Sequence, residues 1–228
     1  MACTLLGWGV GLPLSRLIHF LPRLLEASWR APAEGPVAPR EPPWPSWCDP
    51  VTSGRRGVQA VASGLYGLCA WRFGLDLSLI FALVFCSALI ALAFIDARTS
   101  LLPDLLTLPL LWAGLLVSTV GGWTSVTHAV WGAALGYGGL WLVYHAFRLT
   151  TGKDGMGYGD FKLLAALGAW LGIGLVPGML LMACLAGATV GVILRLAGRL
   201  APDQALPFGP YLAGAGVVTL LFLADLTG

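Results

Sequence analysis

Two aspartates stand at the edges of apolar runs and are the strongest candidates for chemistry. Asp96 ends one such run and Asp160 opens another. Two carboxyl groups held at matched depth on neighbouring helices can share one proton, because two adjacent like charges resist joint ionisation. One then acts as a base and the other as an acid, which is the apparatus for activating a water against a peptide carbonyl. The alternative is that each aspartate only flanks a helix end, where Asp160 would suit the helix dipole.

Glycines precede the second aspartate at alternate positions, Gly155, Gly157 and Gly159. Glycine lets one backbone approach another closely, and a protease acting at a membrane must hold an unwound strand beside its acid. A nucleotide loop is excluded, since GxGxxG needs a preceding strand and the Walker pattern needs GK[ST]. The other reading, packing of glycine-rich helices, better explains a second set of glycines. That set is Gly132, Gly136, Gly187 and Gly191.

Composition points to the elements that must position these groups. The chain has 228 residues, of which 57% are hydrophobic and 11% charged, and its formal net charge is +2. Soluble domains carry about twice that charged fraction. The hydrophobicity excludes a disordered chain, and the small net charge argues against nucleic-acid binding. We therefore expect an all-α, polytopic membrane helical bundle, since about eight helices of about 20 residues fit within this length.

The apolar runs predict eight spans in two parts of the chain. A first helix and a Pro- and Arg-rich loop occupy residues 1–57, with the irregular loop over 22–57. The membrane-embedded core occupies residues 58–228. The spans are expected at roughly residues 4–21, 58–71, 77–95, 105–120, 126–147, 161–175, 177–196 and 208–223.

The basic residues orient these spans. Twelve of the 13 Lys and Arg lie in or beside the loops that follow spans one, three, five and seven, and only Arg72 lies on the other side. Because basic loops stay in the cytoplasm, both termini are expected outside the cytoplasm. Asp96 and Asp160 are then expected at the cytoplasmic edge of the membrane.

Several stretches resemble one family. The sequence GMGYGDFKLLAALGAW at 155–170 resembles the GxGD signature of the prepilin peptidases, the type IV leader peptidases. The stretch FID at 94–96, followed by LPDLLTLP at 102–109, resembles the family's first aspartate motif. PFGPYLA at 207–213 resembles its closing motif, and remnants of its first-helix motif remain at Gly11, His19, Leu21 and Pro22.

The resemblance implies an aspartic endopeptidase of the bacterial cytoplasmic (inner) membrane. Its substrates would be type IV prepilins or the pseudopilins of type II secretion, each with a short basic leader that ends in Gly and precedes a hydrophobic helix. The cut falls between leader and helix on the cytoplasmic side. The other expected partner is membrane lipid, and nucleic acid is not expected.

The resemblance also assigns residues. Carried over, Asp96 and Asp160 are the catalytic pair, and no metal is required for this step. Gly157 and Gly159, the two glycines of the GxGD motif, are expected to support the binding of the substrate. Asp104 and Lys162 belong to the motifs but not to the pair. We predict that Lys162 tunes Asp160 electrostatically or anchors the interface, and that Asp104 is a helix N-cap.

The chain departs from the family in its first loop. Many members also methylate the new N-terminus with S-adenosylmethionine, and they usually carry two CxxC pairs there, the ligand set of a zinc site. Here that loop holds only Cys48, which excludes a Cys₄ site, and Gln59 stands near the position of a family Glu. Either a shortened, metal-free loop docks on the core or methylation has been lost. We favour a peptidase, with S-adenosylmethionine as a cofactor only if methylation is retained.

Two rival functions are weighed against this prediction. In a transporter or channel, the two aspartates would relay protons or cations, but they lie at one edge of the membrane and no internal repeat is evident. In an inactive scaffold of a secretion assembly, the missing cysteines would be a sign of degeneration. Both aspartates and the GxGD stretch are nevertheless intact, and hydrolysis needs those parts.

Overall fold

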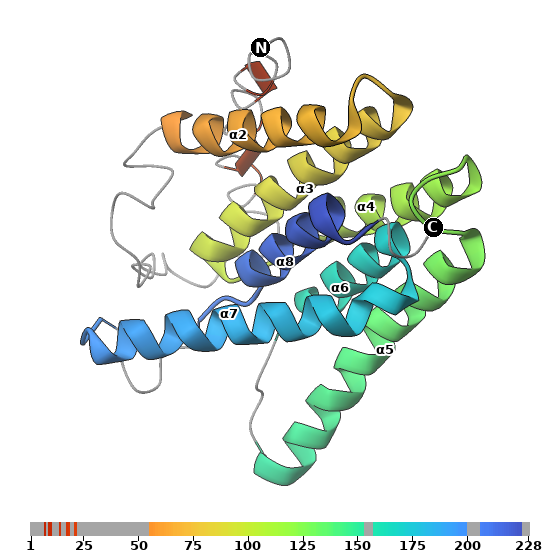
Figure 1. The fold of residues 1–228 in the computed structure, drawn as a ribbon. Coiled ribbons are helices and arrows are strands. Elements are labelled where there is room, and N and C mark those ends of the chain that lie inside the picture. Colours follow the sequence, from red (N-terminus) through yellow and green to blue (C-terminus); the bar gives the residue numbers. More distant parts are fainter. Residues whose placement is uncertain are drawn as a thin grey trace, which may run out of the picture.

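A computed structural model describes residues 55–152, 157–199 and 206–224, together with isolated positions before residue 22. Within these ranges the chain is helical and contains no strand, so the all-α prediction is confirmed for them (Figure 1). The elements are α2 (Arg55–Phe73), α3 (Leu77–Thr99), α4 (Asp104–Thr119), α5 (Val126–Thr151), α6 (Tyr158–Leu171), the 3-10 helix η2 (Ile173–Leu175), α7 (Val176–Leu196) and α8 (Gly209–Phe222).

Seven of the eight expected spans correspond to these helices, with ends that differ by a few residues. The largest difference lies in the expected span 161–175, which divides at Gly172 into α6 and η2. Gly172 has φ 86°, a left-handed value that suits glycine and ends the helix. The expected span 4–21 and most of the expected loop 22–57 lie outside the described residues, and α2 already begins at Arg55.

Fewer of the described helices meet the length and composition of a membrane span than the eight spans expected from the sequence. By length and composition, only α3 and the combined helix Ile173–Leu196 could cross a membrane among the described residues. The helices α4, α6 and α8 have 16, 14 and 14 residues. At about 1.5 Å per residue, 14 residues reach about 21 Å, short of a hydrocarbon core of about 30 Å. Helix lengths therefore do not establish eight spans.

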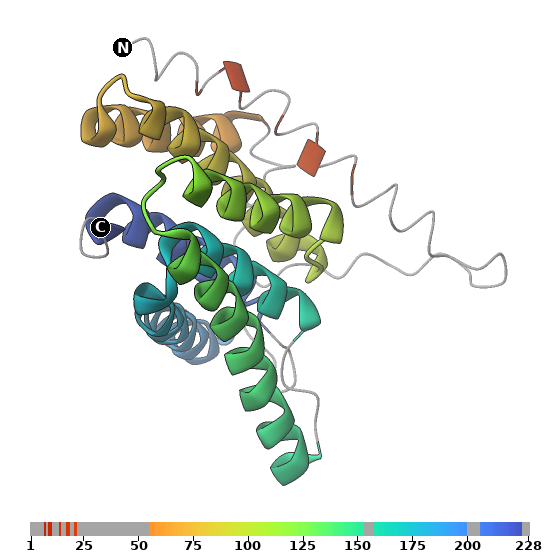
Figure 2. The same ribbon diagram turned by 90° about the vertical axis from the view of Figure 1, so that its right-hand side faces the viewer.

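Helix α6 is the centre of the bundle. It packs against α4, α5, α7 and α8 (Figures 1 and 2). Eleven of its 14 residues are buried, in a nearly continuous run. A helix that is apolar on all sides is stable only when neighbours surround it, so the sequence of α6 requires this position.

Glycines set the closest helix contacts. Gly132 and Gly136 of α5 face α6, where a Cβ on Gly136 would lie 2.6 Å from the carbonyl oxygen of Leu164. Gly132 of α5 and Gly168 of α6 are in mutual backbone contact, which leaves no room for a Cβ on either residue. The helix-packing interpretation of Gly132 and Gly136 is thus confirmed.

Helix α8 lies between α3 and α6. A Cβ on its Gly216 would lie 2.6 Å from Leu167 of α6 and 3.3 Å from Leu89 of α3. Gly209 and Gly216 are seven residues apart and so lie on one face of the helix. The narrow face of α8 allows it to pack closely against both helices that carry Asp96 and Asp160.

Candidate active site

Asp96 lies in the last turn of α3. The helix ends at Ser100, which has φ 52° and donates its backbone N–H to the carbonyl of Asp96 over 2.8 Å. The aspartate side chain is 4% exposed. Its Oδ2 accepts a hydrogen bond of 2.9 Å from the backbone N–H of Gly209. Burial of a carboxyl group is costly without such a partner.

Gly209 is the first residue of α8, and its position explains why it is a glycine. A Cβ there would lie 2.6 Å from Oδ2 of Asp96, closer than real Cβ contacts occur. The first N–H groups of a helix have no partner within the helix and carry partial positive charge. The start of α8 therefore presents a donor to the Asp96 carboxyl group.

Asp160 lies in the first turn of α6, with Gly157 at the N-cap position. Its side chain is 7% exposed. The position near a helix N-terminus agrees with the dipole interpretation made from the sequence. Asp96 and Asp160 lie within electrostatic range of each other. The structure therefore brings the two predicted aspartates together at one end of the bundle.

The glycines before Asp160 have different surroundings. A Cβ on Gly159 would lie 2.7 Å from Cβ of Leu102, so this glycine lets α6 pack against the connection between α3 and α4. A Cβ on Gly157 would be 4.0 Å from Oδ2 of Asp160, which is ordinary contact. Gly157 is exposed and leaves open space beside the carboxyl group. Gly155 lies outside the described residues.

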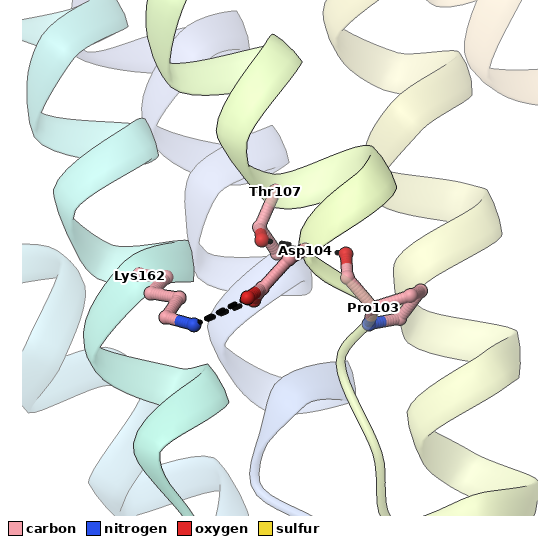
Figure 3. A network of polar contacts seen from close by, with 4 residues as sticks. All are labelled: Pro103, Asp104, Thr107 and Lys162. Atoms are coloured by element: carbon pink, nitrogen blue, oxygen red, sulfur yellow. Dashed lines mark hydrogen bonds and ion pairs between the residues drawn. The ribbon is translucent and has the colours of Figure 1, made fainter. Parts of the chain in front are cut away.

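Asp104 and Lys162 form an ion pair between α4 and α6 (Figure 3). The Lys162 ammonium donates to both carboxylate oxygens of Asp104, over 2.6 and 2.8 Å. The N-cap prediction for Asp104 is wrong, because Pro103 holds that position and Asp104 is the first helical residue. The ammonium group of Lys162 thus pairs with Asp104 and not with Asp160. The predicted electrostatic effect of Lys162 on Asp160 is not supported by a direct contact between them.

Potential metal ligands do not gather in the part of the chain that the structure describes, where no group of three His, Cys, Asp or Glu side chains is found. Cys69 and Cys86 are buried with their Sγ atoms 3.7 Å apart, and Cys184 is exposed. Gln59 is buried in α2. Cys48 and His19 lie outside the described residues.

Comparison with known proteins gives the family of this chain. Residues 83–192 match the type IV leader peptidase family. The chain is 40% identical to the "Prepilin leader peptidase/N-methyltransferase" of Dickeya chrysanthemi, over 97% of this chain and 92% of the relative. The chain belongs to the type IV leader peptidase family. Proteins with the same name are 42% identical in Aeromonas hydrophila, over 96% of this chain and 89% of the relative, and 37% identical in Pseudomonas aeruginosa, over 99% and 91%.

Two further observations come from these comparisons. The alignment with the Dickeya leader peptidase covers 261 positions, more than the 228 residues of this chain, so that relative contains residues with no counterpart here. No solved structure matches the chain.

Gly209 is the site residue that sequence reasoning missed. The closing motif PFGPYLA contains it, but a motif does not say which group its backbone N–H will meet. The signal was a glycine directly before a proline at the start of an apolar run, since proline is typical of the first turn of a helix.

Proposed function

We propose that this chain is a membrane aspartic endopeptidase that removes the short basic leader, after its terminal Gly, from type IV prepilins or type II secretion pseudopilins. Membership of the type IV leader peptidase family supports prepilin processing. One observation carries the assignment of the reaction to specific residues. Asp96 and Asp160 are both buried, the first bonded to the start of α8 and the second in the first turn of α6, and they lie within electrostatic range of each other.

The hydrogen bond at Asp96 suggests how the pair divides its work. A backbone N–H stabilises an ionised carboxylate, so we assign the base to Asp96 and the proton-carrying acid to Asp160. Asp96 takes a proton from a water as the water oxygen bonds to the peptide carbonyl carbon, and Asp160 gives its proton to the carbonyl oxygen. Asp96 then gives its proton to the leaving amine as the C–N bond breaks. Asp160 recovers a proton from one hydroxyl, which restores the starting state.

The proposal places the protein in the inner membrane as a multi-pass chain. The combined helix Ile173–Leu196 supports this, since it is apolar along its length and only 11% of its most apolar stretch is buried in the protein. Such a surface needs lipid rather than water around it. The short helix α6 is enclosed by neighbouring helices, so it can lie at membrane depth without matching the bilayer thickness.

The orientation is part of the same proposal: eight spans, both termini outside the cytoplasm, and the catalytic aspartates at the cytoplasmic face. The ends of α3, α5 and α7 carry basic residues in their last turns, as the positive-inside rule requires of cytoplasmic ends. Those residues are Arg98, Arg148 and Arg195. A basic leader of the substrate would meet the aspartates at the surface of this membrane face.

N-methylation of the new N-terminus is a separate reaction from leader cleavage. The relatives' printed name includes N-methyltransferase, whereas the loop of this chain holds only Cys48 and cannot form a Cys₄ zinc site. Methylation with S-adenosylmethionine would require a metal-free loop. The mass of the mature N-terminus distinguishes the two states directly.

The test is cleavage of a co-expressed prepilin or pseudopilin by the wild type, by Asp96→Asn and by Asp160→Asn. The matched control is Asp76→Asn, an exposed aspartate at the other end of α3. We expect both site variants to accumulate precursor at normal membrane levels, while wild type and control release the leader. Failure of the wild type on several precursors, or cleavage by the two site variants, would favour the scaffold or the transporter instead.

A further inference from the structure

The first turn of α6 holds Asp160 on a sequence that starts a helix poorly. Gly157 is the N-cap residue and has no side chain that could accept a hydrogen bond from the free N–H groups of the turn. Gly159 lies inside the turn, where glycine lowers helix stability. The N–H of Asp160 donates to the carbonyl of Gly157 over 3.2 Å, at the long end of the usual range. Contacts with other elements must therefore hold this turn in place.

Aromatic rings provide such contacts from α5. Tyr144 is 5% exposed, whereas residues 145–150, which follow it, are exposed or half-buried. The centroid of its ring lies 5.4 Å from that of Tyr158 and 5.6 Å from that of Phe161. These distances are typical of interacting aromatic pairs. Tyr144 therefore contacts α6 at the residue two before Asp160 and at the residue directly after it.

Phe161 is the centre of this group of rings. It is fully buried, and its ring centroid also lies 5.4 Å from that of Tyr158 and 6.1 Å from that of Tyr137. Tyr137 and Tyr144 are two helical turns apart and so share one face of α5. Both tyrosines thus hold the start of α6 from the side of α5, while Leu102 lies close to Gly159 from the connection between α3 and α4.

We propose that Tyr144 is a positioning residue for the catalytic pair: its ring holds the first turn of α6 and so keeps Asp160 in place beside Asp96. The inference rests on the proposed peptidase function, in which Asp160 gives its proton to the carbonyl oxygen of the substrate. Tyr144 acts through Tyr158 and Phe161 and not on the substrate itself. A displacement of about 1 Å at a reacting group can slow a reaction by about a hundredfold.

The first test compares Tyr144→Ala and Tyr144→Phe with a matched control, Leu142→Ala. Leu142 belongs to the same helix and is 64% exposed, so its truncation leaves the rings in place. The folded fraction of each variant is isolated by size exclusion in detergent, and kcat and KM are measured with a purified prepilin. If Tyr144→Ala does not fold, Tyr144→Leu replaces it, because leucine fills more of the space and still lacks a ring.

We expect Tyr144→Ala to lower kcat by about tenfold to about a hundredfold with little change in KM, because the chemical step is impaired and the docking of the substrate is not. Tyr144→Phe keeps the rings and should stay close to wild type, as should the control. A loss in Tyr144→Phe as large as in Tyr144→Ala would overturn the ring contacts as the cause. An unchanged kcat in Tyr144→Ala would overturn the positioning role. Failure of the wild type to cleave would count against the peptidase function instead.

A second measurement does not depend on turnover. The folded enzymes are treated with a water-soluble carbodiimide and glycine ethyl ester, which convert an accessible carboxyl group to an amide. Peptide mass spectrometry then compares the labelling of each buried aspartate with that of Asp76, which is exposed. Asp160 is 7% exposed and Asp96 is 4% exposed, so both should label slowly in the wild type.

We expect Tyr144→Ala to increase the labelling of Asp160 severalfold and to leave Asp96, which is bonded to the start of α8, unchanged. Tyr144→Phe should label as the wild type does. Equal labelling of Asp160 in wild type and Tyr144→Ala would show that the turn is held without this ring. An increase at both aspartates would show a general loosening of the bundle and would reject a local role for Tyr144.

Discussion

At the scale of the residue, the contact between Gly209 and Asp96 combines two requirements in one position. The residue must donate a backbone N–H, and it must leave space for the carboxyl oxygen 2.9 Å away. Alanine would satisfy the first requirement and fail the second, since its Cβ would lie 2.6 Å from Oδ2. A Gly209→Ala variant therefore disturbs the contact with Asp96 without weakening the helix, because alanine has a higher helix propensity than glycine.

We therefore predict that Gly209→Ala reduces leader cleavage strongly without loss of the folded protein. A hydrogen bond to a charged group contributes about 1.5–3 kcal/mol, which corresponds to about tenfold to about a hundredfold in rate. The measurement is kcat/KM in detergent or vesicles. The control is Gly214→Ala, an exposed position on the same helix with no atom within 4 Å of its Cβ. Equal activity of the two variants would contradict the role of this contact.

The ion pair between Asp104 and Lys162 is expected to contribute little to the stability of the protein. The side chains are 54% and 28% exposed, so solvent screens their attraction. We expect Asp104→Asn or Lys162→Gln alone to lower the free energy of unfolding by about 0.2–1 kcal/mol. The double variant should lose no more than the larger single loss. Denaturation in detergent at low and high salt measures this, and strictly additive losses would show that the two residues act independently.

At the scale of the element, the crossing of α5 and α6 depends on glycines. We predict that Gly136→Ala lowers the free energy of unfolding by about 1–3 kcal/mol, since its Cβ would overlap the backbone of α6. Gly138→Ala, two residues away with open space at its Cβ, should be neutral or stabilising by up to about 1 kcal/mol. Thermal denaturation of both variants measures the difference. Equal midpoints would mean that α5 and α6 can separate without cost.

The elements were largely predictable because the apolar runs are bounded by polar or turn-forming residues. The prediction for 77–95 differs from α3 at one end only: the helix continues through Asp96 to Thr99. The split at Gly172 was missed because an apolar run shows no break where a glycine turns the chain. The ends of α4 were predicted to within one residue, yet the N-cap was misassigned to Asp104, because Pro103 and Asp104 are both common at helix starts.

At the scale of the whole molecule, the sequence predicted the aspartate pair but not its surroundings. The glycine spacing before Asp160 and the resemblance of both stretches to family motifs singled out Asp96 and Asp160 among the aspartates beside apolar runs. The contact of Gly209 with Asp96 depends on how α8 lies between α3 and α6. The sequence of a single helix does not specify that arrangement. The pairing of Lys162 with Asp104 likewise joins residues 58 positions apart.

The proposed orientation predicts which loops face the cytoplasm. Leu101 and Val120 are exposed and follow α3 and α4 respectively, at opposite ends of the bundle. With Cys3, Cys48 and Cys184 replaced by Ser, Val120→Cys should react with an impermeant maleimide in intact spheroplasts. Leu101→Cys should react only after lysis. The reverse pattern would invert the topology, and labelling of both in intact spheroplasts would count against a membrane between them.

The position of Asp96 in the last turn of α3 and Asp160 in the first turn of α6 has a consequence for the end of the reaction. A cut at the end of the bundle sorts the two products by solvent. The charged leader dissolves in water, and the apolar helix stays in lipid with its backbone hydrogen bonds intact. Resynthesis would need both fragments to meet again across a phase boundary. In the proposed reaction, partition of the products therefore adds to the favourable free energy of hydrolysis and opposes resynthesis.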